Sequence, residues 1–424
     1  MFKNYINSDL SSFHTPGHKN KNFLKFDILK NDLTELELTD ELYNCKKGIL
    51  KAEIKFSNLY NTKRTIFSAG GNTLCIQTMI GLVHKKSKKI LCVRNIHKSV
   101  INTFGLLDID PVFASPNLKN IKKKIKKYRN DINSVFLTSP NYYGEIFDIK
   151  SISEICKKYN ISLLVDNAHG SHLRFLKENL HPINLGADLV ADSLHKTLPV
   201  LTGGAVLHIN NTKFIDNSKN VMSIFGSTSP NFSILNSINL CRKWLENNGS
   251  NNFQILENKV NGIKEILKNK NIKFLHDNCD PVRIVINVNS AGFNGKEFVN
   301  YLHKHKIEPE FYDNKYVVLI PSNFNIKKDW DRLEKALMNI KIKNKKVIID
   351  HFEFNLPKVS LSIREAMFSK SEMVFLKNSK HRVISELIAP CPPGTPILIP
   401  GELIRNEEQQ LLKYYGIHIL NVVK

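Results

Sequence analysis

The stretch Ala187–Leu207, ADLVADSLHKTLPVLTGGAVL, places a polar turn between two short apolar runs. Apolar runs of this length, bounded by turn signals, are typical of buried strands, so we predict strands at Asp188–Ala191 and Ala205–Ile209. A lysine at the mouth of a buried strand loses part of its hydration, which lowers its pKa and lets its amine form a Schiff base. Lys196 has that place, and Ser193 can offer a hydroxyl to a phosphate beside it. Most lysines that follow a strand are solvated loop residues, so the prediction depends on the preceding sequence.

The same pattern, a strand followed by a polar or glycine-rich cluster, recurs upstream. Helical segments such as Leu74–Val83 fill the gaps between the strands. This alternation predicts an α/β fold with a mostly parallel sheet that is covered on both faces. Ligands of such sheets bind beyond the carboxyl ends of the strands, so we expect the clusters to converge on one rim. The four upstream strands are predicted at Thr65–Ser68, Lys89–Arg94, Ser134–Thr138 and Ser162–Val165.

The side chains at these strand ends have complementary chemistry. The glycine-rich turn at Gly71 precedes a helix, and a helix N-terminus presents N–H groups and a positive dipole to an anion. Asp166 suits a protonated ring nitrogen, because a carboxylate raises the pKa of a nearby cation. His97 offers a flat ring for stacking. Together with Lys196 these residues meet the requirements of pyridoxal phosphate. Taken singly, Asp166 is also typical of a helix N-cap and His97 of an ordinary strand end.

Size and composition indicate a globular protein with more than one domain. The chain has 424 residues, of which 42% are hydrophobic and 24% charged. We expect an N-terminal arm over residues 1–50, a cofactor-binding major domain over 51–250, and an α+β C-terminal region over 251–424, with a division near 345 left open. No apolar run is long enough to cross a membrane, and the N-terminus lacks the apolar core of a secretory signal. Seven scattered cysteines without C-x-x-C spacing favour a cytoplasmic location and argue against a zinc site, so we expect no metal.

The net charge of +22 raises the question of nucleic-acid binding. The lysine-rich runs lie far apart, at 85–89, 122–127 and 341–346. In the middle run Ile121 and Ile125 recur at helical spacing, which is typical of a helix with a solvated outer face. No nucleic-acid-binding module accompanies the charge, so we favour a basic surface. A regulatory or nucleic-acid-binding protein remains as an alternative.

The motifs resemble those of one known family along nearly the whole chain. The chain is similar to the bacterial ornithine/lysine/arginine decarboxylases of the fold-type I pyridoxal phosphate class, and it is close in size to the short members without an N-terminal wing domain. The resemblance implies a major domain with a mostly parallel sheet of the seven-stranded type, a smaller α+β C-terminal domain and an N-terminal arm. It rests on the segments FHTPGHK, TEL…DEL, NIHKSV, TSPNYYGEIFDI, LLVDNAHGSHL, GADLV, DSLHKTLP, GSTSP and PPGTPILIPGE.

The resemblance also implies a role for each matching residue. Lys196 would be the Schiff-base lysine, Asp166 the partner of the pyridine nitrogen and His97 the stacking ring. These three residues and His195, which lies beside the lysine, are the predicted catalytic residues. The family's site lies at a dimer interface, so we expect a homodimer whose partner chain contributes Ser227 or Thr228. Within one chain the other predicted cofactor contacts are Ser193, His195, His169, Gly71, Asn72 and Thr73.

The implied reaction is α-decarboxylation of arginine, lysine or ornithine to an amine and CO2, as in polyamine biosynthesis. His195 or the released Lys196 would return a proton to the α-carbon. Glu402, in the C-terminal PGE turn, is a candidate partner for the cationic side chain, although a helix cap or a surface acid fits it better. The alternative is another fold-type I enzyme, an aminotransferase or a lyase. An aminotransferase needs an arginine for the α-carboxylate, and none stands out in the sequence.

Three positions depart from the family pattern. The family commonly has Glu after the ring-nitrogen aspartate, where this chain has Asn167. The phosphate turn often reads G-[ST]-T, where residues 70–73 read GGNT. Gly203 and Gly204 stand where others often have Gln and a small residue. None of these changes removes a cofactor contact, but they weaken the transfer of substrate specificity.

Overall fold

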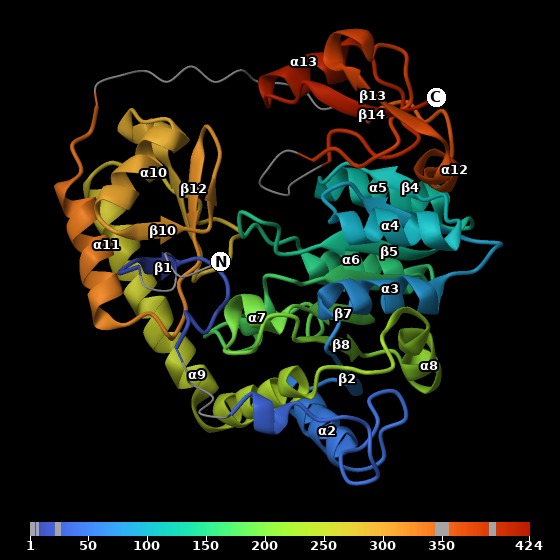
Figure 1. Cartoon of the computed structure of the whole chain (residues 1–424), viewed down its shortest axis with the longest axis horizontal. Helices are drawn as coiled ribbons and strands as arrows, with labels where there is room; N and C mark the ends of the chain where they lie inside the picture. Colours follow the sequence, from blue (N-terminus) through green and yellow to red (C-terminus); the bar gives the residue numbers. More distant parts are fainter. Residues whose placement is uncertain (1–4, 6–7, 22–26, 344–355, 390–395) are drawn as a thin grey trace.

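A seven-stranded sheet forms the centre of the major domain in this computed structural model, which describes residues 5, 8–21, 27–343, 356–389 and 396–424 (Figure 1). The strand order is β2-β8-β7-β6-β5-β3-β4. β8 runs antiparallel to both of its neighbours and the other pairings are parallel, which confirms the predicted mostly parallel sheet. The strands are β2 (Arg64–Ser68), β3 (Lys89–Val93), β4 (Val112–Ala114), β5 (Ile132–Thr138), β6 (Ser162–Asp166), β7 (Leu189–Asp192) and β8 (Ala205–Ile209).

The sequence pattern predicts every strand of this sheet except β4. The β4 run has only three residues and two of them are half-buried, so it gives too little periodicity for recognition. The predicted helix at Leu74–Val83 begins earlier, at Gly71, directly after β2. The glycine turn is therefore the first turn of the helix.

Apolar clusters on both faces of the sheet bind the helices to it. One cluster joins the sheet to α3 (Gly71–Val83), α4 (Lys98–Leu107) and α8 (Ile215–Phe225). The cluster on the opposite face joins it to α5 (Leu118–Tyr128) and α6 (Ile149–Lys158). In α5 the two isoleucines Ile121 and Ile125 are fully buried while the lysines between them face outward, as predicted.

A smaller domain lies beside the sheet, drawn in orange in Figure 1. Its antiparallel sheet has the order β11-β12-β9. The predicted boundary at residue 250 is not a break in the fold, because it falls inside the 38-residue helix α9 (Phe232–Asn269), which packs against both α2 (Gly48–Tyr60) and α11. The elements of the smaller domain are β9 (Ile284–Asn287), α10 (Gly295–Lys304), β10 (Ile307–Pro309), β11 (Phe311–Tyr312), β12 (Tyr316–Leu319) and α11 (Lys327–Asn339).

The predicted N-terminal arm packs on the body of the protein. Its strand β1 (Ser11–Phe13) pairs in parallel with β10 of the smaller domain. Phe13 is fully buried and makes an edge contact with the ring of Trp330 in α11. The arm therefore joins the chain's N-terminal residues to a sheet formed almost 300 residues later.

The C-terminal region has an apolar core of its own and lies over the α4 side of the major domain (Figure 1). α12 packs directly on α4. The division expected near residue 345 lies outside the described residues. Among those described, no helix combines the length and the apolar character needed to span a bilayer. The elements of the C-terminal region are α12 (Ile363–Phe368), β13 (Ser371–Phe375), α13 (Asn406–Tyr414) and β14 (Ile419–Val423).

Candidate active site

Lys196 lies at the carboxyl edge of the sheet, in the short helix α7 (Leu194–Thr197) that follows β7. Its Nζ is 3.1 Å from Nε2 of His169, which follows the end of β6. Burial lowers the pKa of Lys196, although the negative charge of Asp166 opposes that shift. The lysine therefore has the partly desolvated amine that the sequence predicted.

Asp166 ends β6 and is almost completely buried. Its Oδ1 accepts hydrogen bonds from Nδ2 of Asn72 at 2.7 Å and from the backbone N–H of Ala168 at 3.2 Å. Burial raises the pKa of Asp166 to about 6, and the charge of Lys196 acts in the opposite direction. Asn72 was predicted to hold a phosphate, but here its amide donates to the acid that is expected to face the ring nitrogen.

The glycine turn is tied to the glycine pair that precedes β8. The backbone N–H of Gly71 donates to the carbonyl of Gly203 at 2.8 Å. Gly71 has a φ of +68°, and a Cβ built on it would meet no atom within 4 Å. An open, left-handed position at the start of α3 leaves room for a ligand. Thr73, in the same turn, is exposed, whereas Ser193 is buried at the base of α7.

Two further predicted histidines lie at the same edge of the sheet. His97 caps the N-terminus of α4, where its Nδ1 accepts from the backbone N–H of Ser99 at 3.2 Å. Burial and the nearby charge of Lys196 lower the pKa of His97 to about 4. His195 has its Nδ1 at 3.2 Å from the carbonyl of Gly204, and burial lowers its pKa as well. Both rings are therefore neutral at neutral pH, which suits stacking better than charge pairing.

An arginine of the smaller domain reaches this site, and the sequence analysis did not single it out. Arg283 is fully buried and its Nη2 donates to the backbone carbonyl of His169 at 3.3 Å. Its Nη1 donates to the carbonyl of Tyr142 at 3.2 Å and lies 3.5 Å from Nδ1 of His169. Asp280, in turn, forms an ion pair with Arg283, and its Oδ1 lies 2.9 Å from Nε2 of His172. The one signal in the sequence was a basic residue inside the apolar run 282–288.

Glu310 is the second site residue that the sequence did not reveal. Its Oε1 accepts from the hydroxyl of Tyr142 at 2.7 Å, and its Oε2 accepts from the backbone N–H of Thr15 at 2.7 Å. The ring of Tyr142 stands edge-on to His169, with 4.9 Å between the ring centroids. A chain of contacts therefore runs from Lys196 through His169 and Tyr142 to this carboxylate.

The FHTPGHK segment of the arm closes over α7. The backbone N–H of Gly17 donates to the carbonyl of His195 at 2.8 Å, and a Cβ at this glycine would meet the backbone of Leu198 at 2.7 Å. Lys19 is buried, with its Nζ donating to the carbonyl of Ile320 at 2.8 Å, and burial lowers its pKa to about 7. Only a glycine permits so close an approach of the arm to the lysine-bearing helix.

One predicted residue, in the C-terminal PGE turn, has other surroundings than expected. Glu402 is neither a helix cap nor a surface acid: its two carboxylate oxygens accept from Nη1 and Nη2 of Arg94 at 2.6 and 2.7 Å in a buried ion pair. That pairing leaves it unsuited to bind a substrate cation. Ser227 and Thr228 lie in an exposed turn, and among the described residues of this chain neither is hydrogen-bonded to the site.

The residues of this edge fit a pyridoxal phosphate. Buried polar atoms without a hydrogen-bond partner in the described structure include Oδ1 of Asn72, Oδ1 of Asn95 and Oγ1 of Thr138. Asn72 contacts Asp166, and Thr138 pairs with Asp166 in the sheet register, so two of these atoms lie beside the predicted ring-nitrogen acid. Buried polar atoms are normally satisfied, and a polar ligand at this position would supply the missing partners.

Comparisons with known proteins agree with this arrangement. The major domain of Orn/Lys/Arg decarboxylase matches residues 1–287, and the C-terminal domain of the same family matches residues 350–419. The chain is 29% identical to an arginine decarboxylase of Bacillus subtilis over 437 residues, covering 93% of this chain and 88% of the relative. In fold it resembles the constitutive lysine decarboxylase of E. coli, with a TM-score of 0.76 and 16% identity over 100% of this chain and 81% of the other. It also resembles lysine decarboxylase A of Pseudomonas aeruginosa, with a TM-score of 0.81 and 13% identity over 100% of this chain and 79% of the other.

The matched residues include the lysine, the aspartate and the three histidines described above. The agreement of motifs, sheet topology and site geometry leads to one conclusion. The chain belongs to the Orn/Lys/Arg decarboxylase family and is a pyridoxal-phosphate-dependent decarboxylase of a basic amino acid.

Proposed function

We propose that this enzyme decarboxylates arginine, with Lys196 and Asp166 as its central catalytic residues. The observation that carries the proposal is a buried amine with a lowered pKa at the same sheet edge as a buried carboxylate. The preference for arginine is supported by curated relatives named arginine decarboxylase that cover nine-tenths of the chain. Lysine and ornithine are the competing substrates.

Pyridoxal phosphate, when bound, supplies an aldehyde for amines and a ring that accepts the electron pair left by CO2. Asp166 holds a proton on the ring nitrogen, because a carboxylate in a low-dielectric site favours a cation beside it. Asn72 fixes the orientation of that carboxylate through its 2.7 Å hydrogen bond. Ser193 and the turn at Gly71 would hold the phosphate, and the neutral ring of His97 would lie against the cofactor.

The hydrogen bonds of His169 determine which of its two ring nitrogens carries the proton. Arg283 can only donate, so its contact with Nδ1 of His169 leaves the proton of that ring on Nε2. Nε2 then donates to Nζ of Lys196, 3.1 Å away, which favours the unprotonated form of the amine. His195 donates its Nδ1 proton to the carbonyl of Gly204, so Lys196, after taking up the proton that the substrate ammonium group gives up, is the better candidate for returning a proton to the α-carbon.

Glu310 is the proposed partner for the cationic end of the substrate. Each of its oxygens accepts one hydrogen bond, from Tyr142 or from Thr15, and each retains a second lone pair. A carboxylate with a free lone pair on both oxygens matches the two-pronged donor of a guanidinium. Its charge also acts on Lys196, which places it within electrostatic reach of the reacting amine.

The assembly and location that we propose are a homodimer and the cytoplasm. An exposed Ser227–Thr228 turn, without hydrogen bonds to the site of its own chain, supports a contribution to a partner's phosphate site. Free thiols at all six of the described cysteines support a reducing compartment.

A product analysis tests the proposed function. The purified protein, saturated with pyridoxal phosphate, is incubated separately with arginine, lysine and ornithine, and CO2, amine and 2-oxo acid are measured. We expect agmatine and CO2 in equal amounts from arginine and at least tenfold slower turnover of the other two. Formation of a 2-oxo acid without CO2 would establish an aminotransferase, and faster turnover of lysine or ornithine would overturn the preference for arginine.

A matched pair of variants tests Glu310. Glu310→Gln is expected to raise KM for arginine at least tenfold with a smaller change in kcat, because the amide keeps the shape but loses the charge. Glu308→Gln is the control, since Glu308 lies two residues earlier and pairs with His303 at 3.1 Å instead. Equal KM values for the two variants would remove Glu310 from substrate recognition.

A further inference from the structure

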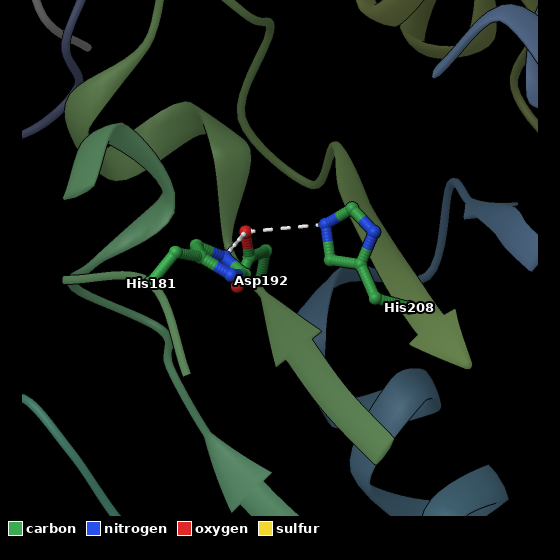
Figure 2. Close-up of side chains that lie close together, drawn as sticks. All are labelled: His181, Asp192 and His208. Atoms are coloured by element: carbon green, nitrogen blue, oxygen red, sulfur yellow. Dashed lines mark hydrogen bonds and ion pairs between the residues drawn. The ribbon is translucent and has the colours of Figure 1, made fainter. Parts of the chain in front are cut away.

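A buried polar cluster lies directly behind the predicted ring-nitrogen acid. Nδ2 of Asn167 donates to Oδ1 of Asp192 at 2.7 Å, and both side chains are fully buried. Oδ2 of Asp192 lies 2.9 Å from Nε2 of His181 and 3.4 Å from Nε2 of His208. Figure 2 shows both rings turned towards this carboxylate. The proposed mechanism uses none of the four residues.

The hydrogen bonds around His181 exclude the simplest alternative, a metal site. Two histidines and an aspartate have the composition of such a site, and their ligand atoms lie within 4.8 Å of one another. The backbone N–H of Ile183, however, donates to Nδ1 of His181 at 3.3 Å, so the ring proton must be on Nε2. That nitrogen donates to Asp192 and has no lone pair for an ion.

The two histidines hold Asp192 in its charged form. Burial alone would raise the pKa of Asp192, but the hydrogen bond from His181 and the imidazole of His208, 3.4 Å away, outweigh burial and hold the pKa well below its usual range. The hydroxyl of Thr65 is 2.8 Å from Nδ1 of His208 and fixes that ring from the other side. Asp192 is therefore a permanent buried carboxylate.

A charged Asp192 explains the departure at residue 167 from the family pattern. A glutamate at this position would bring a second carboxylate to within hydrogen-bonding distance of Asp192, with no proton between them and no solvent to screen the charges. An amide supplies the donor that Asp192 needs. Only one of the residues 167 and 192 can be negatively charged, and in this chain it is Asp192.

The pair also spans the two strand ends that bear the central catalytic residues. Asn167 directly follows Asp166, and Asp192 lies four residues before Lys196. The backbone N–H of Asn167 donates to the carbonyl of Ala191 at 2.9 Å, so a main-chain and a side-chain hydrogen bond join β6 to β7 at one point.

We propose that Asn167 and Asp192 are positioning residues. The buried hydrogen bond between the amide of Asn167 and the carboxylate of Asp192 determines where Asp166 lies relative to Lys196. The proposal rests on the proposed cofactor site and is independent of the substrate. Asparagine and aspartate side chains have the same size and shape, so their exchange restores one amide facing one carboxylate. Asn167→Asp alone places two carboxylates together, and Asp192→Asn alone removes the charge and directs an amide N–H at either Asn167 or His181.

Three variants test this proposal by an exchange of the two groups: Asn167→Asp, Asp192→Asn and the double variant. The affinity of each apoprotein for pyridoxal phosphate and the absorbance maximum of the bound cofactor are measured beside the thermal midpoint. We expect each single variant to bind the cofactor at least tenfold more weakly and to shift the absorbance maximum. The double variant should return to within threefold of the parent affinity and to the parent maximum.

A second asparagine–aspartate pair provides the control. Nδ2 of Asn211 donates to Oδ1 of Asp188 at 2.8 Å at the opposite end of β7, so the same exchange there should leave cofactor affinity and absorbance unchanged. If Asn167→Asp fails to fold, recovery of folding and binding in the double variant demonstrates the same coupling. Single variants within twofold of the parent affinity, or a double variant no better than the weaker single, would overturn the proposal. A parent that binds the cofactor but releases no CO2 would refute the proposed function alone.

Discussion

At the scale of single residues, the site holds groups whose charged forms burial disfavours. Asp166, His97 and Lys196 all have pKa values shifted towards the neutral form, and burial is the largest cause in each case. Residues with shifted pKa values are concentrated at functional sites, because catalysis often needs a protonation state that the same group would not have in water. Of these three groups, Asp166 is the one whose charged form a protonated ring nitrogen of the cofactor would restore.

We therefore expect Asp166→Asn to stabilise the apoprotein while weakening cofactor binding. The pKa of Asp166 is about 6 in the folded protein against 3.8 in the reference state, so the folded state binds the proton more tightly and stability falls as pH rises from 4 to 6. The Asp166→Asn variant does not undergo this fall in stability, so we expect its free energy of unfolding at pH 7 to exceed that of the parent apoprotein by about 3 kcal/mol. Urea unfolding of both apoproteins at pH 4 and pH 7 measures the difference, which should nearly vanish at pH 4. An equal difference at both pH values would show that the carboxylate is not the cause.

At the scale of elements, the proposed cofactor site is built from the turns that follow the strands. The carboxyl ends of β2, β3, β6 and β7 are followed by Gly71, His97, His169 and Lys196, and all of these strands run in the same direction. The antiparallel β8 brings its preceding glycine pair to the same edge, where Gly203 accepts from the N–H of Gly71. Each turn is short, so the strand that precedes it determines where the side chains of the turn lie.

Gly71→Ala separates the backbone requirement of this turn from its ligand requirement. A left-handed φ costs an L-residue roughly 1–2 kcal/mol, and no atom lies where the new methyl group would be. Gly416→Ala is the matched control, because Gly416 has a φ of +71° and equally open surroundings in the C-terminal region. Denaturant unfolding should show a similar small loss in both variants. Cofactor affinity should fall at least tenfold in Gly71→Ala only, and equal affinities would remove this turn from the phosphate site.

At the scale of the whole molecule, a buried ion pair joins the C-terminal region to the major domain, in addition to the packing of α12 on α4. The two-pronged contact between Arg94 and Glu402 joins the end of β3, three residues before His97, to a turn more than 300 residues later. Glu402 also accepts from the backbone N–H of Ile399 at 2.8 Å, and Arg94 contacts the carbonyls of Pro396 and Ile397. Arg94 and Glu402 therefore each contact several polar groups in a part of the protein that is buried from solvent.

Breaking this pair should be much more costly than replacing it. Glu402→Gln leaves the Arg94 guanidinium buried and uncompensated, and we expect a loss of 3–5 kcal/mol, in line with the usual cost of about that size. Arg94→Met with Glu402→Leu should recover at least half of that loss. The half-exposed pair Arg382–Glu372 is the control, and Glu372→Gln should leave the unfolding midpoint unchanged. Chemical denaturation of the four proteins measures the differences, and a loss in Glu402→Gln as small as the control's would contradict a buried attachment.

The sequence by itself determined six of the seven strands of the sheet, their mostly parallel arrangement and the residues at the sheet edge. Apolar runs followed by polar clusters recur along the chain, and parallel strands necessarily bring their carboxyl ends together, so Lys196, Asp166, His97 and Gly71 could be placed at one edge without coordinates. Local patterns carry this information because strand and turn formation depend on neighbouring residues.

Only the tertiary structure decided which distant residues complete the site. Arg283 and Glu310 come from the smaller domain, and Thr15 and Gly17 from the arm, through contacts that no local pattern encodes. The same holds for Glu402, whose partner lies 308 residues away. It also holds for Asn167, whose proposed role depends on its hydrogen bond to the carboxylate of Asp192. A charged or amide side chain has the same local signature whether it is solvated or buried, and the surrounding fold alone determines its partner.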